Sequence, residues 1–124
     1  DFGQLGHGDS LSKDVPTLMK VFDQRVQAAS LSVGADFMFL IAFSGALYSW
    51  GRNSFGQLGH GVPFRHDSKL SRIPVDEPTP RLVAYFSQRP KGQAPVLLSM
   101  VACGAHHVVA VADNRQIVYA WGRG

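Results

Sequence analysis

Six short hydrophobic segments, separated by glycine or polar turns, recur along the chain. Three follow one another at residues 27–33, 37–43 and 46–50, and three more at 96–103, 107–112 and 117–121. They are rich in Val, Ile, Phe, Tyr and Trp, which favour strands. The connections at 44–45 and 113–116 are short and polar or glycine-containing, as in β-hairpins. The pattern therefore predicts two sets of three antiparallel strands.

The middle segment of each set is apolar beyond what a half-buried strand needs. Residues 37–43 are apolar at every position, and residues 108–112 nearly so. A half-buried strand alternates, so both faces of these strands should be covered. A helix is the rival interpretation of 37–43, but Gly34 and Gly45 bracket it at strand length. We predict an all-β fold of β-propeller blades, each an antiparallel sheet of three to four strands.

The heptapeptide FGQLGHG occurs twice, at residues 2–8 and 55–61. Other landmarks recur in the same order, including a segment from Pro to Phe at 16–22 and 80–86, and a Trp-Gly-Arg at 50–52 and 121–123. A unit of roughly 50 residues with loop insertions is typical of stacked-repeat and propeller proteins. We expect two repeats, at about 1–51 and 52–124, with inserted loops at about 62–80 and 87–95.

The region between the two sets of strands shows no convincing pattern. Residues 52–80 contain four prolines, counting Pro80 itself, and no alternation of apolar and polar positions. We expect a long surface loop there.

Charge is concentrated in the same region. The chain of 124 residues has a net charge of +3, and the excess lies between residues 62 and 95. A basic loop of this kind fits an acidic partner, either protein or nucleic acid, whereas the alternative is a solvated loop without a partner. The predicted partner-binding residues are Arg65, His66, Lys69, Arg72, Arg89 and Lys91.

Candidate chemistry in the chain is sparse. The string 56–61 has the order GxxGxG, which is neither the dinucleotide fingerprint nor a phosphate loop. Cys103, His106 and His107 lack a second ligand pair at zinc-finger spacing. Cys103 and His107 could be considered a nucleophile and its base, but strand residues four apart lie about 13 Å from one another, out of hydrogen-bond reach. We expect no catalytic residue, cofactor, metal or small-molecule substrate.

Composition bears on the cellular compartment and on membrane association. The single cysteine allows no internal disulfide, and the longest apolar run, 37–43, is far shorter than the roughly 20 residues of a membrane helix. We expect an intracellular protein, cytoplasmic or nuclear, that does not enter a membrane.

The motifs together resemble the repeat of the regulator of chromosome condensation family. The matching residues of the second copy are Gly104, His107, Tyr119, Trp121 and Gly122. Those of the first are Gly34, Tyr48, Trp50, Gly51, Asn53, Gly56, Gln57, Leu58, Gly59 and Pro80. The first copy has Phe37 where the family has a histidine, which suggests a structural position. The resemblance implies a seven-bladed propeller, of which this chain holds about two repeats as a fragment.

Structural roles follow for a set of repeat-defining residues. Its members are Gly3, Leu5, Gly6, Gly34, Trp50, Gly51, Gly56, Leu58, Gly59, Gly104, His107, Trp121 and Gly122. The glycines suit positive φ or close backbone approach. The tryptophans should fill the space between adjacent blades and the two leucines should plug the loops against the same core. The His107 ring should hydrogen-bond loop backbone groups.

The resemblance also implies what such a chain does. We expect a non-catalytic scaffold that holds other proteins and the remaining repeats of its own polypeptide. One alternative is part of a guanine-nucleotide exchange factor for a Ran-type small GTPase, which would act near chromatin. Another is the propeller arm of a multidomain ubiquitin ligase or kinase. The irregular insertions favour the first of these.

Overall fold

Two antiparallel sheets form the body of the computed structural model, which describes residues 1–20, 22, 25–61 and 75–124. Sheet A has the order β1 (Ala28–Val33), β2 (Phe37–Ala42), β3 (Leu47–Gly51) and β4 (Glu77–Leu82). Sheet B has the order β5 (Leu98–Cys103), β6 (His107–Ala112) and β7 (Val118–Gly122). The six predicted strands are confirmed within two residues at each end, and so are the sheets of three and four strands.

Strand β4 corrects the expected loop at 52–80. It pairs antiparallel with β3, with Leu82 opposite Tyr48 and Arg81 opposite Ser49. The sequence did not predict this strand because it contains Pro78 and Pro80, and proline lacks an N–H and is confined to sheet edges. The Val83 N–H donates to the Leu47 carbonyl at 2.8 Å. Since N–H groups alternate along a strand, those of positions 78 and 80 point away from β3, where proline costs no ladder bond.

The segment from Pro80 to Phe86 completes this edge. After β4 it forms a single helical turn, α1 (Ala84–Ser87), whose Phe86 is buried. No helix in the described ranges has the length and apolar character needed to cross a membrane.

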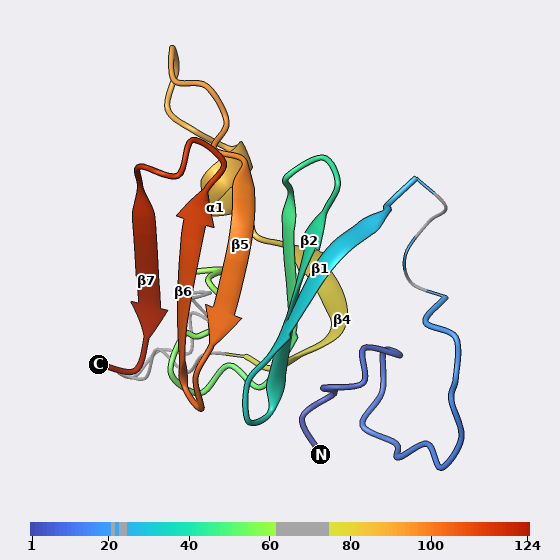
Figure 1. Ribbon diagram of the computed structural model, residues 1–124. Helices are drawn as coiled ribbons and strands as arrows, with labels where there is room; N and C mark the ends of the chain where they lie inside the picture. Colours follow the sequence, from blue (N-terminus) through green and yellow to red (C-terminus); the bar gives the residue numbers. More distant parts are fainter. Residues whose placement is uncertain (21, 23–24, 62–74) are drawn as a thin grey trace.

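Sheet A lies between sheet B and the N-terminal segment (Figure 1). Its odd-numbered β2 residues face sheet B and are almost fully buried against Val108 and Ala110 of β6. Its other face packs on the N-terminal segment through Met19 and Phe22. Strand β2 is thus covered on both faces, as its sequence predicted.

Strand β6 differs from its counterpart. Val108 and Ala110 are buried, but His107 is exposed and Val109 is 37% exposed. The expectation of burial on both faces is wrong for this strand, because no described element lies on the side of sheet B away from sheet A. The equivalent face of sheet A, in the first repeat, is the one that sheet B covers.

Repeats in sequence and sheets in space are out of phase. Strand β4 follows the second FGQLGHG string, yet it is hydrogen-bonded to β3 of the first repeat. The repeat boundary expected near residue 51 would therefore fall inside sheet A, between its third and fourth strands.

Candidate functional site

Each FGQLGHG loop is held by a tryptophan of the strand set that follows it. The Trp50 indole N–H donates to the Gln4 carbonyl at 2.9 Å. The Trp121 indole N–H donates to the Gln57 carbonyl at 2.8 Å. Because both bonds join the same positions of the two copies, the loop and the tryptophan form one repeated structural element.

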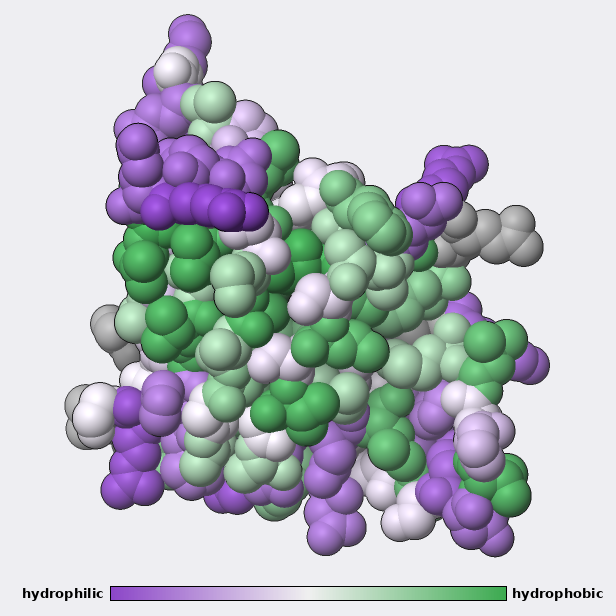
Figure 2. Space-filling view, viewed as in Figure 1, coloured by the Kyte–Doolittle hydropathy of each residue, from purple (hydrophilic) through white to green (hydrophobic). Residues whose placement is uncertain are grey.

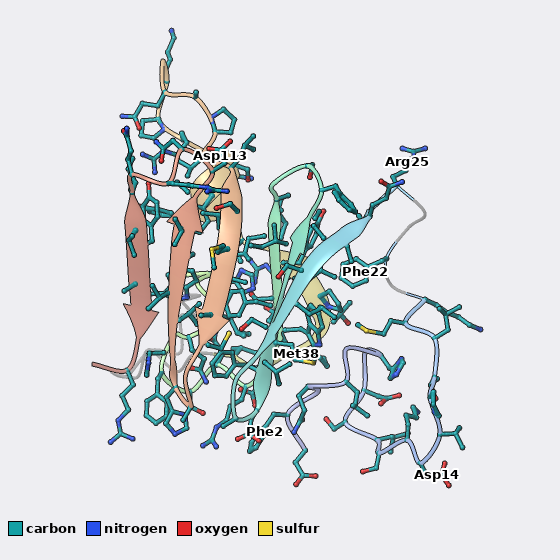
Figure 3. All side chains as sticks on the ribbon, viewed as in Figure 1. Phe2, Asp14, Phe22, Arg25, Met38 and Asp113 are labelled. Carbon is teal, nitrogen blue, oxygen red and sulfur yellow. The ribbon has the colours of Figure 1, made fainter. Side chains whose placement is uncertain are left out.

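A phenylalanine completes this element in each copy. The Phe22 ring lies edge-on to the Trp50 ring with centroids 6.0 Å apart, and Phe86 lies 5.9 Å from Trp121. Phe22 sits on the side of sheet A away from sheet B (Figure 3). Trp121 instead lies between the sheets, where its ring contacts Phe39 at 5.8 Å. The tryptophans therefore fill space between layers.

Close packing explains the loop glycines. A Cβ added at Gly6 would lie 2.9 Å from the Trp50 indole nitrogen, and one at Gly59 would lie 3.1 Å from that of Trp121. Both glycines also have φ above 70°, which L side chains rarely adopt. The repeat-defining glycines with positive φ are Gly3, Gly6, Gly51, Gly56, Gly59 and Gly122.

At two other glycines, an aromatic ring packs where a Cβ would otherwise lie. A Cβ at Gly34 would lie 2.3 Å from the Phe37 ring, and one at Gly104 would lie 2.3 Å from the His107 ring. The two rings occupy equivalent places, so the Phe-for-His difference leaves the packing intact. Within the described chain the His107 ring makes no hydrogen bond, contrary to expectation, and packs against Gly104 instead.

The two loop leucines differ in burial. Leu58 is fully buried in the core between the sheets, whereas Leu5 is 42% exposed. The second loop lies between sheet A and sheet B. Among the described residues, the first loop has a sheet on one side only. The same residue type therefore plugs a core in one copy and lies at the surface in the other.

Sequence reasoning missed a hydrogen-bonded pair formed by buried Ser49 and partly buried His60. Ser49 is fully buried, and its Oγ lies 3.0 Å from His60 Nε2 and 2.7 Å from the Leu58 carbonyl. Burial and the nearby positive charge of Arg81 lower the pKa of His60 from 6.5 to about 4, although Glu77 and Ser49 oppose this. The imidazole is thus neutral at neutral pH.

This pair does not have the arrangement of a nucleophile and its base. The single Ser49 hydroxyl proton goes to the Leu58 carbonyl, so Oγ accepts from His60 Nε2–H. We assign the Nε2–H tautomer on that basis. A protonated Nε2 takes no proton from the hydroxyl, and the buried Oγ is closed to a substrate. The pair instead ties the second FGQLGHG loop to β3.

Cys103 lies at the end of β5 and joins the two sheets. Its backbone N–H donates to the Ser32 hydroxyl of β1 at 3.1 Å. Burial raises the pKa of its thiol, which keeps it protonated and unreactive. No group of three or more His, Cys, Asp or Glu side chains in the described part of the chain could hold a metal ion.

Four of the six predicted partner-binding residues, Arg65, His66, Lys69 and Arg72, lie outside the described residues. The other two, Arg89 and Lys91, lie in the loop after α1. The Arg89 guanidinium stacks 5.5 Å from the Tyr85 ring centroid and donates to the Gln93 side chain at 3.1 Å.

That loop is closed by a hydrogen bond from the Gln93 N–H to the Pro90 carbonyl at 3.0 Å. Gly92 has φ of 87°, as the third residue of a type II turn requires. Lys91 is exposed at the tip. The backbone of the loop thus forms a closed turn with Lys91 exposed at its tip.

An apolar groove of about 310 Å³ runs along the outer edge of β7. It is lined by glycines of the second loop, by Val83 and by residues of α1 and β7: Gly56, Gly59, Gly61, Val83, Tyr85, Phe86, Tyr119, Ala120 and Trp121. The equivalent place on sheet A is filled by β4. There Pro78 lies over Gly3, and the Gly8 N–H donates to the Pro78 carbonyl at 2.9 Å. The groove therefore has the form of an open strand seat.

Comparison with known proteins agrees with this architecture. The model of the Regulator of chromosome condensation (RCC1) repeat matches residues 1–41 and 44–111. This chain belongs to the RCC1 repeat family. A second RCC1 repeat model matches residues 28–57, around the first hairpins.

Relatives of the RCC1 repeat chain include Protein RCC2 of Mus musculus, 36% identical over 98% of this chain. The E3 ubiquitin-protein ligase HERC2 of Homo sapiens is 32% identical over the whole chain, which spans 2% of HERC2. The Ultraviolet-B receptor UVR8 of Arabidopsis thaliana is 31% identical. The chain spans 24% of mouse RCC2, about a quarter of its length.

Solved structures share the fold. Human WBSCR16 superposes with a TM-score of 0.71 at 22% identity, over 98% of this chain and 26% of that protein. Yeast RCC1 (Prp20), solved in complex with Kap60, superposes with a TM-score of 0.63 at 26% identity, over 98% of this chain and 26% of its own. The chain is an RCC1-type propeller segment, and the prediction of the family is confirmed.

Proposed function

We propose that this RCC1-type segment is a non-catalytic interaction module of a larger intracellular propeller protein. The observation that supports it most directly is the ordered loop at 88–95. Arg89 is fixed against Tyr85, and Lys91 projects at the tip of a closed turn. A preorganised loop loses little conformational entropy on binding, which favours partner recognition.

The remaining repeats are the second class of partner. The strand seat beside β7 is apolar and glycine-lined, and β4 fills the same seat on sheet A. A following repeat would supply the missing strand for sheet B. The segment would then contact its own polypeptide through the open face and edge of sheet B, and other proteins through its loops.

The test uses the complete protein as bait in quantitative affinity purification. The double variant Arg89→Glu with Lys91→Glu should lose at least one partner by about fivefold or more, because charge reversal repels an acidic surface. The control reverses two exposed lysines of the N-terminal segment, Lys13→Glu with Lys20→Glu, and should keep that partner. If both doubles retain every partner equally, the loop is not an interaction site.

A deletion tests the other four candidate residues. Removing 64–73 takes away Arg65, His66, Lys69 and Arg72 but leaves Asp76, whose carboxylate accepts from the Asn53 N–H at 2.8 Å. Loss of a partner distinct from those of the Arg89 and Lys91 variant would assign a second contact to this insertion. An unchanged partner set would reduce the insertion to a solvated loop.

Nucleotide exchange on a Ran-type GTPase is a second candidate function. It is supported by the likeness to Prp20p of Saccharomyces cerevisiae, 26% identical, for which binding properties to Gsp1p and histones are described. The complete protein would then accelerate nucleotide release from such a GTPase. No acceleration at saturating protein would eliminate this function and leave the scaffold role, including that of a ligase or kinase arm, in place.

A further inference from the structure

An arginine stacks on the phenylalanine that begins each FGQLGHG string. The Arg52 guanidinium carbon lies 4.5 Å from the centre of the Phe2 ring. The Arg123 guanidinium carbon lies 4.9 Å from the centre of the Phe55 ring. Both arginines directly follow the last strand of their set, β3 or β7. The aromatic face attracts and holds the guanidinium, so each copy places one cation at the same point.

The backbone beside the arginine is also the same in the two copies. The Arg52 N–H donates to the Asp36 carbonyl at 2.9 Å, and the Arg123 N–H donates to the His106 carbonyl at 2.9 Å. The glycine before each arginine has φ above 100°, and a Cβ there would lie 2.5 Å from the same carbonyl oxygen. Positions 36 and 106 are therefore equivalent neighbours of the two arginines.

The two copies differ in the side chain at that neighbouring position. In the first copy, Asp36 Oδ2 lies 3.4 Å from Arg52 Nη1, so the cation is paired. In the second copy the position is His106, whose ring centroid lies 5.0 Å from that of Phe55. An imidazole carries no negative charge in either protonation state, and no described residue forms an ion pair with Arg123. The second copy thus keeps the cation and the ring without the carboxylate.

This cluster lies at the surface, within reach of another protein. Phe55 is 38% exposed and Arg123 is exposed. Figure 2 shows hydrophilic residues gathered at the end of sheet B where β7 ends, and Phe2 lies at the same end of sheet A (Figure 3). Two side chains, those of Arg123 and His106, already pack on the Phe55 ring. Less of that ring is left for a nucleobase to stack on, which favours a protein partner.

We propose that Arg123, His106 and Phe55 form a site for a carboxylate side chain of a partner protein, in the role that Asp36 has beside Arg52. The partner's Asp or Glu would accept hydrogen bonds from the Arg123 guanidinium, whose planar fork of N–H groups matches a carboxylate. Phe55 holds the guanidinium, and the His106 ring supplies a further donor in the same cluster. The proposal adds a surface to the interaction role proposed above and rests on that role.

Fluorescence anisotropy of a defined probe with the complete protein tests this site. The probe is fluorescein-labelled Gly-Glu-Gly-Glu-Gly-Glu-Gly, and the control peptide has Gln in place of each Glu. Arg123→Gln should weaken binding of the acidic probe about threefold, as expected for an exposed ion pair. Lys20→Gln removes the same charge from the N-terminal segment and should leave the affinity unchanged. Equal losses in the two variants, or equal binding of the two peptides, would overturn the proposal.

Exchanging the residues at positions 36 and 106 tests the comparison between the two copies. His106→Asp supplies an internal carboxylate, so it should weaken the probe as much as Arg123→Gln does. The double variant His106→Asp with Arg123→Gln should bind like Arg123→Gln alone, because the new carboxylate acts through Arg123. Asp36→His should free Arg52 and strengthen binding about twofold, since a second site then captures the probe. Additive losses in the double variant, or no gain in Asp36→His, would contradict the proposal.

Two further outcomes separate this proposal from its alternatives. A twelve-nucleotide oligouridine that binds more tightly than the acidic peptide, and loses affinity in Arg123→Gln, would assign the site to nucleic acid and overturn the proposal. Partners lost in the Arg89 and Lys91 double variant would still stand if the acidic peptide fails to bind. Failure of the carboxylate site and failure of the interaction role are therefore distinguishable.

Discussion

Acidification should loosen the link between the second FGQLGHG loop and β3 through His60. The His60 pKa is about 4 in the folded protein and 6.5 in the unfolded chain. The unfolded state therefore binds more protons, and stability falls as pH drops from about 6.5 towards 4. Above pH 6.5 the full contribution is present, because both states are neutral there.

The size of this effect follows from the two pKa values. The difference corresponds to about 3 kcal/mol when the ring is fully shielded from water. Because the His60 ring keeps partial contact with solvent, screening reduces the expected loss to about 1–2 kcal/mol at pH 5. Loss of the β3 link should also expose the amides of β4, whose Arg81 lies opposite Ser49.

Hydrogen exchange with mass spectrometry on the complete protein measures this locally. Protection of amides at 47–51 and 77–82, corrected for intrinsic rates, should fall between pH 7.5 and pH 5 in wild type. In the His60→Gln variant, protection of these amides should be lower than in wild type at pH 7.5 and should not change between pH 7.5 and pH 5. His7→Gln is the matched control, since His7 has the same place in the first FGQLGHG string. An unchanged pH response in His60→Gln would refute the reasoning.

Four further outcomes are expected. Gly34→Ala should cost about 2–3 kcal/mol because its ring partner is buried, whereas Gly104→Ala should cost under about 1 kcal/mol because its partner ring is free to turn; thermal unfolding of both variants compares them. Asn53→Ala should cost about 2–4 kcal/mol by orphaning the Leu58 N–H and the Val75 carbonyl, and exchange protection in β4 should fall first. Arg115 has a φ of 59°, so Arg115→Gly should raise the free energy of unfolding by up to about 1 kcal/mol because glycine adopts positive φ without strain, and an unchanged or lower thermal midpoint would contradict this. The isolated chain should aggregate through the open face of sheet B, so a monomeric, cooperatively melting sample by ultracentrifugation and calorimetry would be contrary evidence.

The sequence predicted the hairpin strands because their pattern is local. Glycine turns and runs of β-branched and aromatic residues mark each of the six segments without reference to the rest of the fold. Burial of β2 could also be predicted, since residues 37–42 are apolar on both sides. The burial of β6 could not, because His107 and Val109 depend on whether another layer lies on sheet B.

Strand β4 was missed for a physical reason. Its sequence, EPTPRL, has poor intrinsic strand character, and its extended form is imposed by the edge of β3 and by the Asn53 contacts with Val75 and Asp76. The 64-residue offset between Pro16 and Pro80 was a usable signal, because it ties β4 to a position that recurs in both copies. The Ser49 and His60 contact left no such trace, since the second copy has Ala120 in place of Ser49.

The phase difference between repeats and sheets bears on how such a chain can be duplicated or cut. A repeat begins with the strand that completes the sheet of the repeat before it and continues with three strands of its own. Each inserted repeat therefore docks by adding a strand to the preceding sheet. A cut at residue 51 strips β4 from β3, whereas a cut after Ser87 keeps sheet A whole with its helical turn. Segments for crystallisation or for exchange between relatives are therefore better ended after Ser87 than at residue 51, and they should keep the N-terminal residues that pack on Trp50.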